Sequence, residues 1–439
     1  MPDTAALHAD LHADPHPALT GGSRPVAPDP PVWPERGEEE ARLLQEVLRD
    51  GRWSTPAGPR TTRFEHRFAE LQALPSPSHV RCVTSGTVAL QLACEALGLG
   101  PGDEVVVPGL AEQGTAGAVL DANAVPVLVD VSPDTWCLDP AAVTAAITDR
   151  TRAVIAVHLY GTMPDLTELT ALAAQNGLAL IEDCAHAHGA RWEEHGAGAF
   201  GTMSVFSFGA SRTLTAGEGG CVVTSDAVLA DQLSSLRDSG RPPSDVPPPF
   251  WRPVQSGNHR MTEWQAAVLL AQCDRFEEQR DRRERVVAAW REAAERSGFL
   301  RPARVLPGVR RPPGYAFAAS YDERALNGVP VETFRAALAA ELSAPVEPCY
   351  RPLGDSPFYR PRTKRKHWLS AAYWNAIDPA RSDLPNCATL HRTSVVVPHA
   401  ATLRPGAEEH LPQALEKIAR GADRLRRWRS DPWSSHSHL

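Results

Sequence analysis

Short apolar runs alternate with stretches of helical spacing through the first half of the chain. The runs that predict buried strands lie at 79–83, 104–107, 125–131, 153–159, 178–183, 203–208 and 221–224. Helical spacing follows at 88–97, 166–175 and 227–236. Continuous apolar strands alternating with helices are typical of an α/β domain whose mostly parallel sheet is covered on both faces. Ligands of such a sheet bind at the carboxyl ends of its strands.

The second half predicts a different arrangement. Its helices are expected at 261–296, 331–342 and 408–428, with a strand near 315–320 and a Pro-rich surface loop at 242–249. We therefore predict a large three-layer αβα domain over 35–295 and a smaller α+β domain over 296–425. The Pro-rich residues 1–34 and the polar residues 426–439 are predicted to be disordered tails.

Composition narrows the function classes. The chain has 439 residues, 22% charged, with a formal net charge of -8, so it lacks the basic surface that nucleic acid requires. No apolar run approaches the roughly 18 residues of a membrane helix, and the first 20 residues lack a signal-peptide pattern. The eight cysteines are dispersed without C-x-x-C spacing, so neither a disulfide framework nor a metal site is predicted. We expect a cytoplasmic protein that acts on a small molecule.

Candidate chemistry gathers where predicted strands end. The turn TSGT at 84–87 lies between a strand and a helix, where free backbone N–H groups can bind an anion, although most such turns are only helix caps. Asp183 ends a strand and is followed closely by His186. A carboxyl group at this place either serves a site or caps a helix.

Further short motifs accompany these residues in a fixed order. The stretches are TSGT at 84–87, AL at 89–90, VDV at 129–131, PDT at 133–135, HLYG at 158–161, IEDCAHAHGA at 181–190, FSF at 206–208, LTAGEGG at 214–220 and GNHRMT at 257–262. Together they resemble the DegT/StrS family of fold-type-I, pyridoxal-phosphate-dependent sugar and cyclitol aminotransferases, over roughly residues 50–420. Two later stretches, YRPL at 350–353 and RTKRKH at 362–367, resemble the branch acting on cyclitols and aminohydroxybenzoate precursors.

The resemblance implies a role for each matching residue. The cofactor phosphate would be held by Gly86, Thr87 and Ser207, and by Asn258 of a neighbouring subunit, which implies a homodimer with shared active sites. Asp183 would pair with the pyridine nitrogen, and His186 would stand beside the ring hydroxyl. A carboxylate on that nitrogen keeps it protonated, so that the ring can accept electrons.

Two positions depart from the family pattern. The family's lysine, which forms the internal aldimine, falls five residues after Ser207, and this chain has Arg212 there. A guanidinium stays protonated and cannot form a Schiff base, and the chain has no lysine before Lys364. Where the family places an aromatic residue against the cofactor ring, this chain has Glu112. We therefore predict no covalently bound cofactor, although non-covalent pyridoxal or pyridoxamine phosphate stays open.

Several interpretations of these changes remain open. Glu112 and Arg212 could form an ion pair that fills an abandoned cofactor cavity. Alternatively, Arg212 binds an anionic substrate group, with Glu112, Asp183 and His186 as acid and base groups. The first function class is a secondary-metabolite enzyme, of sugar, cyclitol or antibiotic biosynthesis, that works without an internal aldimine. The second is a non-catalytic partner in a hetero-oligomer with an active paralogue. An ordinary pyridoxal- or pyridoxamine-phosphate aminotransferase would need a lysine that this position lacks.

Overall fold

A seven-stranded sheet forms the centre of the large domain. The computed structural model describes residues 16–22, 25–242, 254–363 and 371–428. The sheet order is β1 (His79–Val83), β9 (Gly220–Thr224), β8 (Met203–Ser207), β5 (Ala179–Asp183), β4 (Thr151–Val157), β2 (Glu104–Pro108) and β3 (Val125–Val129). Only β9 within this sheet runs antiparallel to its neighbours, and the four remaining pairings are parallel. The mostly parallel sheet predicted from the apolar runs is confirmed.

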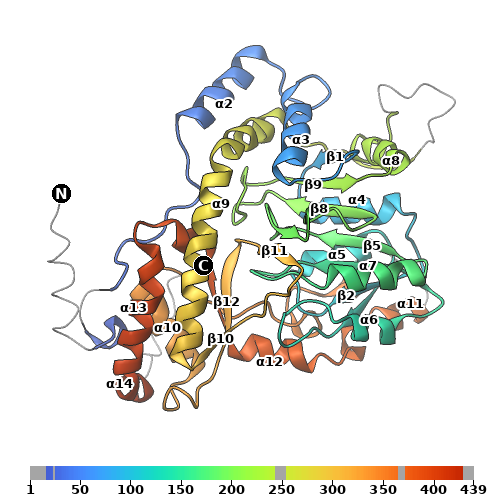
Figure 1. Cartoon of the computed structure of the whole chain (residues 1–439). Coiled ribbons are helices and arrows are strands. Elements are labelled where there is room, and N and C mark those ends of the chain that lie inside the picture. Colours follow the sequence, from blue (N-terminus) through green and yellow to red (C-terminus); the bar gives the residue numbers. More distant parts are fainter. Residues whose placement is uncertain (1–15, 23–24, 243–253, 364–370, 429–439) are drawn as a thin grey trace.

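Helices cover both faces of this sheet (Figure 1). One face carries α4 (Gly86–Ala96), α5 (Gln113–Asp121) and α8 (Ala227–Arg237). The other carries α3 (Arg60–Leu71), α6 (Pro140–Ala146), α7 (Leu166–Gln175) and the start of α9 (Glu263–Ser297). Alternate side chains of the strands enter the two cores, since successive strand residues point to opposite faces. The three-layer αβα arrangement is the expected one.

A smaller antiparallel sheet forms the second domain. It contains β10 (Leu300–Pro302), β12 (Ala316–Tyr321) and β13 (Ser394–Pro398), covered by α10 (Val331–Leu342), α13 (Ala407–Arg420) and the end of α9. Figure 1 shows the long α9 passing from one domain to the other. The single final helix predicted over 408–428 is wrong, because the chain breaks at Gly421 and continues as α14 (Ala422–Arg427). Glycine is a poor helix residue, which favours the break there.

Part of the chain between these small-domain strands returns to the large domain. Helices α11 (Ala371–Ala376) and α12 (Pro385–Thr393) place Tyr373 and Leu390 in the same apolar cluster as Val105 of β2. Asp130 accepts hydrogen bonds from the backbone N–H groups of Asn386 and Cys387, at 2.8 and 2.9 Å, and so holds the start of α12. A third sheet joins β11 (Val309–Arg311) to the hairpin of β6 (Arg191–Trp192) and β7 (His195–Gly196). The two domains are therefore joined by more than α9.

The N-terminal segment is more ordered than predicted. Residues 16–22 and 25–34, expected within a disordered tail, include the 3-10 helix η2 (Ala18–Thr20) and pack on the small domain. Ala27 is buried there, and the backbone N–H of Ala18 donates to Glu341 at 2.7 Å. Its prolines exclude regular structure but not tertiary contacts. The helix α2 (Glu38–Asp50) follows and was not predicted.

Some predictions fall on residues that the structure does not describe. These are the surface loop at 242–249 apart from Pro242, most of RTKRKH at 362–367, residues 1–15 of the first predicted tail, and residues 429–439 of the second. Among the described helices, none combines the length and apolarity that crossing a membrane demands.

Candidate active site

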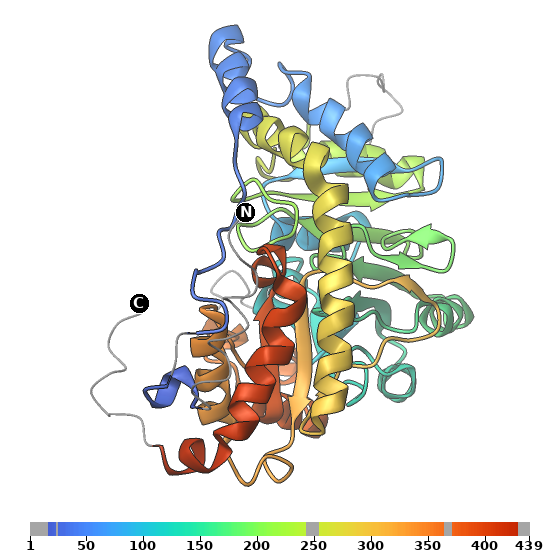
Figure 2. The ribbon, with the colours of Figure 1, turned by 60° about the vertical axis from the view of Figure 1, so that its left-hand side comes forward.

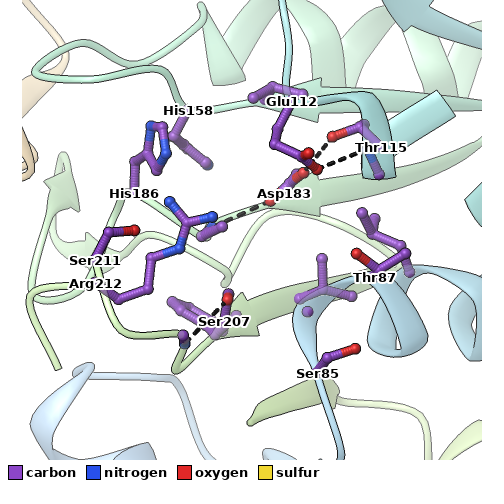
Figure 3. Close-up of a pocket in the computed structure, with 18 of the residues that line it drawn as sticks. Ser85, Thr87, Glu112, Thr115, His158, Asp183, His186, Ser207, Ser211 and Arg212 are labelled. Carbon is purple, nitrogen blue, oxygen red and sulfur yellow. Dashed lines mark hydrogen bonds between the residues drawn. The ribbon is translucent and has the colours of Figure 1, made fainter. Parts of the chain in front are cut away.

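A cavity of about 380 Å³ opens at the carboxyl ends of the central strands. Its walls include Gly86, Thr87, Glu112, Asp183, His186, Ser207 and Arg212, which are seven of the eight predicted site residues. Figure 3 shows the polar groups of this set converging from the ends of β5 and β8 and the starts of α4 and α5. The eighth residue, Asn258, is exposed and does not line the cavity. Its role toward a neighbouring subunit stays a prediction.

One end of the cavity is a cradle built on the start of α4, which we define as Gly86, Thr87 and Ser207. Ser85 caps α4 by accepting from the backbone N–H of Val88 at 3.2 Å. A Cβ at Gly86 would lie 2.7 Å from the Cβ of Ser207, so only glycine fits this approach. The first-turn N–H groups of a helix lack internal partners, which makes this end suited to a phosphate or another anion.

Two neighbouring acids at the end of β5 have different environments. Glu182 is fully buried and accepts from His158 at 3.1 Å and from the backbone N–H of Phe200 and Gly201 at 2.7 and 2.8 Å. Burial alone would raise its pKa, but these donors lower it. The carboxyl group of Asp183 faces the cavity, where burial raises its pKa despite donors from Ala185 and Thr115.

These contacts also explain the buried group of His158, Glu182 and Cys184, whose potential ligand atoms lie within 4.8 Å of one another. Both Glu182 oxygens already accept hydrogen bonds from protein donors. Burial raises the pKa of the Cys184 thiol well above its ordinary value, which opposes the thiolate form that a metal requires. The group is accounted for as a buried hydrogen-bonded pair that fixes the loop after β7.

His186 is held as a neutral ring. The backbone N–H of Tyr160 donates to its Nδ1 at 3.1 Å, and its Nε2 lies 3.5 Å from the hydroxyl of Tyr350. Burial lowers the pKa of His186 well below its usual range, and the charge of Arg212 adds to this. The ring also stacks on Tyr315, with centroids 3.6 Å apart and planes inclined by 8°. A neutral imidazole at this place can exchange a proton with a ligand.

Arg212 lines another part of the cavity wall, beside Tyr315 of the small domain. The guanidinium carbon of Arg212 lies 5.2 Å from the ring centroid of Tyr315, and its buried Nη1 has no hydrogen-bond partner among the described residues. Burial disfavours the charged form of Arg212, but nearby Tyr315, Tyr350 and Asp183 outweigh this effect and raise the pKa of Arg212. Arg212 therefore remains a cation that an anionic ligand would stabilise.

The described side chains of the two replaced residues form no direct ion pair, although the charge of Arg212 acts on Glu112. Glu112 caps α5 by accepting from the backbone N–H of Gly114 at 2.6 Å. Burial raises the pKa of Glu112 and nearby Asp183 adds to this, while the N–H of Gly114 and the charge of Arg212 oppose the rise. The interpretation of a plugging ion pair is therefore wrong in this structure, since the cavity remains open between them.

Sequence reasoning missed several residues of the cavity. Thr115 donates to Asp183 at 3.0 Å, and Tyr350 and Glu218 also line the walls. Thr115 stands in the first turn of a helix after a strand, a position that could have suggested it. Tyr350 opens the YRPL stretch at 350–353, but that motif did not assign it to the site. Tyr315, beside Arg212, comes from the small domain more than 100 residues away, and no local pattern marks it.

The residues fit only part of a pyridoxal phosphate. The cradle suits its phosphate, and Asp183 suits its ring nitrogen. Covalent attachment at position 212 does not fit, because a guanidinium forms no Schiff base. Lys417 forms an ion pair with Glu341 at 3.0 Å in the small domain, and Lys364 and Lys366 lie outside the described residues. The position expected to hold a stacking aromatic ring holds Glu112.

Comparison with known proteins agrees with this geometry. Residues 34–406 match the DegT/DnrJ/EryC1/StrS aminotransferase family. An L-glutamine:2-deoxy-scyllo-inosose aminotransferase of Streptoalloteichus tenebrarius is 40% identical over 422 residues, covering 94% of this chain and 99% of the relative. An L-glutamine:scyllo-inosose aminotransferase of Streptomyces griseus is 39% identical over 412 residues, covering 91% and 97%.

Solved structures show the same fold. The crystal structure of 3-amino-5-hydroxybenzoic acid synthase aligns with a TM-score of 0.77 and 30% identity, over 91% of this chain and 100% of that one. DesI, solved in the presence of its TDP-sugar product, aligns with a TM-score of 0.76 and 29% identity, over 93% and 97%. The fold-type-I arrangement and the family resemblance expected from the motifs are confirmed.

Proposed function

Because the chain belongs to the DegT/DnrJ/EryC1/StrS aminotransferase family, we propose that it is an enzyme of antibiotic biosynthesis that acts on an anionic sugar or cyclitol without an internal aldimine. The observation that carries this proposal is Arg212, a cation without the required amine, beside an intact anion cradle. The inosose ketones for which the relatives are named carry no charge, so the proposed substrate is an anionic sugar or cyclitol and not an inosose itself.

The cradle, Arg212 and the titratable residues each have a separate role in this proposal. The cradle binds one anionic group of the ligand through backbone N–H and hydroxyl donors. Arg212 binds a second acceptor group, and its permanent charge makes that hydrogen bond stronger than a neutral one. His186 is neutral, Asp183 and Glu112 have raised pKa values, and all three reach the cavity, so they can give or take a proton from the bound ligand.

Two further parts of the proposal concern assembly and cofactor. We expect a cytoplasmic homodimer, in which the exposed Asn258 enters the cavity of the neighbouring subunit. Non-covalent pyridoxal or pyridoxamine phosphate would use the same cradle and Asp183. When bound, either would supply an electron sink for the ligand.

Borohydride trapping with pyridoxal phosphate tests the absence of the aldimine. Wild type should form no adduct within residues 209–213, whereas Arg212→Lys should gain one that mass spectrometry locates. An adduct on wild-type protein at the active site would overturn the proposal. Recovery of glutamine-dependent transamination by Arg212→Lys, with wild type inert on the inosose ketones, would instead favour simple loss of the lysine.

Anion binding is measured by calorimetry with sulfate, whose charge is constant near neutral pH. Arg212→Gln should weaken sulfate binding about tenfold, as expected for a lost charge-assisted hydrogen bond. Arg296→Gln, on an exposed turn of α9, is the matched control and should change nothing. Equal affinities of wild type and Arg212→Gln would contradict the role of Arg212.

The second candidate is a non-catalytic partner subunit. The exposure of Asn258 is the observation that favours it, since such a residue could complete a paralogue's site. Turnover of an anionic sugar or cyclitol, such as a sugar phosphate, by the purified chain alone supports the enzyme. Turnover that appears only after mixing with a lysine-bearing relative supports the partner.

A further inference from the structure

The loop that carries Arg212 is held by two rings from distant segments. This loop, residues 209–212, lies between β8 and β9 and lines the cavity. The indole N–H of Trp33, in the N-terminal segment, donates to the carbonyl of Ala210 at 3.0 Å. Nε2 of His399, in the small domain, donates to the next carbonyl, that of Ser211, also at 3.0 Å. Two successive carbonyls are thus bound from outside the large domain.

The two rings also support each other. Trp33 meets His399 edge-on, with centroids 4.6 Å apart and an angle of 87°. Arg283 of α9 lies over the Trp33 ring, 5.2 Å from its centroid. His399 is buried, which lowers its pKa well below the usual range, so the ring stays neutral with Nε2 as its donor.

The N-terminal segment is anchored on both sides of Trp33. Toward the small domain, the backbone N–H of Ala27 donates to Glu341 at 2.9 Å, and Arg404 donates to the carbonyl of Asp29 at 2.9 Å. Toward the large domain, Glu35 accepts from Gln279 of α9 at 2.7 Å. Figure 2 shows this segment, in blue, running from the small domain up to α2. Trp33 therefore lies on a stretch of chain that is fixed at both ends.

We infer that Trp33 and His399 are positioning residues that fix the backbone of residues 209–212 and thereby aim Arg212 into the cavity. The inference rests on the proposed use of Arg212 as the anion-binding group. An arginine side chain has many rotamers, and fixing its backbone lowers the entropy lost when it orders on a ligand. The site is then completed by three parts of the chain, and the N-terminal segment is one of them.

Trp33→Phe tests the inference, because it retains an aromatic ring and removes only the indole donor. The matched control is Trp53→Phe, since Trp53 also donates to a backbone carbonyl at 3.0 Å, that of Val47, at a place that does not line the cavity. Amide hydrogen exchange read by mass spectrometry should become about fivefold faster at residues 209–213 in Trp33→Phe, as expected for one lost hydrogen bond. Trp53→Phe should leave these amides unchanged.

Sulfate affinity is the second measurement, and it should fall about fivefold in Trp33→Phe and stay unchanged in Trp53→Phe. Exchange at 209–213 that matches the control, or that rises equally over the whole chain, would overturn the inference. His399→Phe is the second variant and should show the same local exchange if Trp33→Phe does not fold. If sulfate does not bind wild type, the proposed function fails, while the exchange measurement still decides the role of Trp33.

Discussion

Two parts of one cavity wall are built from different kinds of group. The cradle consists of a helix start, a glycine that approaches Ser207 closely, and small hydroxyl side chains. Another part presents the long charged side chain of Arg212, whereas the carboxyl group of Glu112 lies beside the cradle, near the hydroxyl of Thr87. The cradle residues keep the pattern that the resemblance implies, whereas Arg212 and Glu112 stand at the positions expected to hold the lysine and the aromatic ring.

This difference shows that anion binding and Schiff-base formation depend on different features of the site. Anion binding by backbone N–H groups depends on the fold and survives changes elsewhere. Schiff-base formation depends on a single amine, and one substitution removes it. On the proposed function, the cavity recognises an anionic ligand and does not tether it through residue 212.

The largest effect on ligand binding is expected at the cradle. Gly86→Ala places a Cβ 2.7 Å from that of Ser207 and should weaken sulfate binding by about 100-fold, a cost typical of overpacking. Gly117→Ala in α5 is the control, because a Cβ there meets no atom within 4 Å. It should stabilise the protein by up to about 1 kcal/mol. If calorimetry gives Gly86→Ala a sulfate affinity within twofold of wild type, the cradle does not bind the anion.

Glu182, the buried acid next to Asp183, should contribute to the free energy of unfolding. Glu182→Gln should lower the free energy of unfolding by about 3 kcal/mol near neutral pH, because it disrupts a fully buried hydrogen-bonded pair. The folded-state pKa of Glu182 is lowered, so its contribution is present above the usual pKa of glutamate and is lost as pH falls. Urea unfolding of both proteins over a pH series measures this. A deficit independent of pH would contradict the assignment.

The contribution of Asp183 to the free energy of unfolding should depend on pH in the opposite direction to that of Glu182. Its folded-state pKa is raised by burial, so its stability contribution is present at low pH and is lost as pH rises. Asp183→Asn should therefore raise the free energy of unfolding near neutral pH by about 1 kcal/mol, a typical single-site effect. Urea unfolding beside Glu182→Gln gives the comparison. A loss of stability in both variants would mean that Asp183 is also structural.

The smallest effect is expected at Glu112. An ionised carboxyl group repels an anion, so Glu112→Gln should raise sulfate affinity about threefold at neutral pH, as expected across a solvated cavity. The pKa of Glu112 is raised, so wild-type affinity should decline as pH rises through that pKa. The variant should show a smaller decline by calorimetry. Identical pH profiles would indicate that Glu112 does not face the bound anion.

Sequence patterns located the elements that carry the site. Helices at 166–175 and 331–342 and the strand at 79–83 were predicted with the observed bounds, because periodicity and flanking turns mark them clearly. The helix α5 was not predicted, since its small residues are buried over much of its surface and show little amphipathic contrast. The N-terminal segment was predicted as a tail because contacts with distant residues leave no local pattern.

The sequence by itself determined which functional groups are available. Arg212 stands where the family has its lysine, and the TSGT turn precedes a helix, whatever the packing. Only the tertiary structure decided how these groups meet. It turned the carboxyl group of Glu112 onto the start of α5, and it brought Tyr315 and Trp33 to the Arg212 loop. The physical reason is that side-chain chemistry is local, whereas contacts between distant segments follow from how whole elements pack.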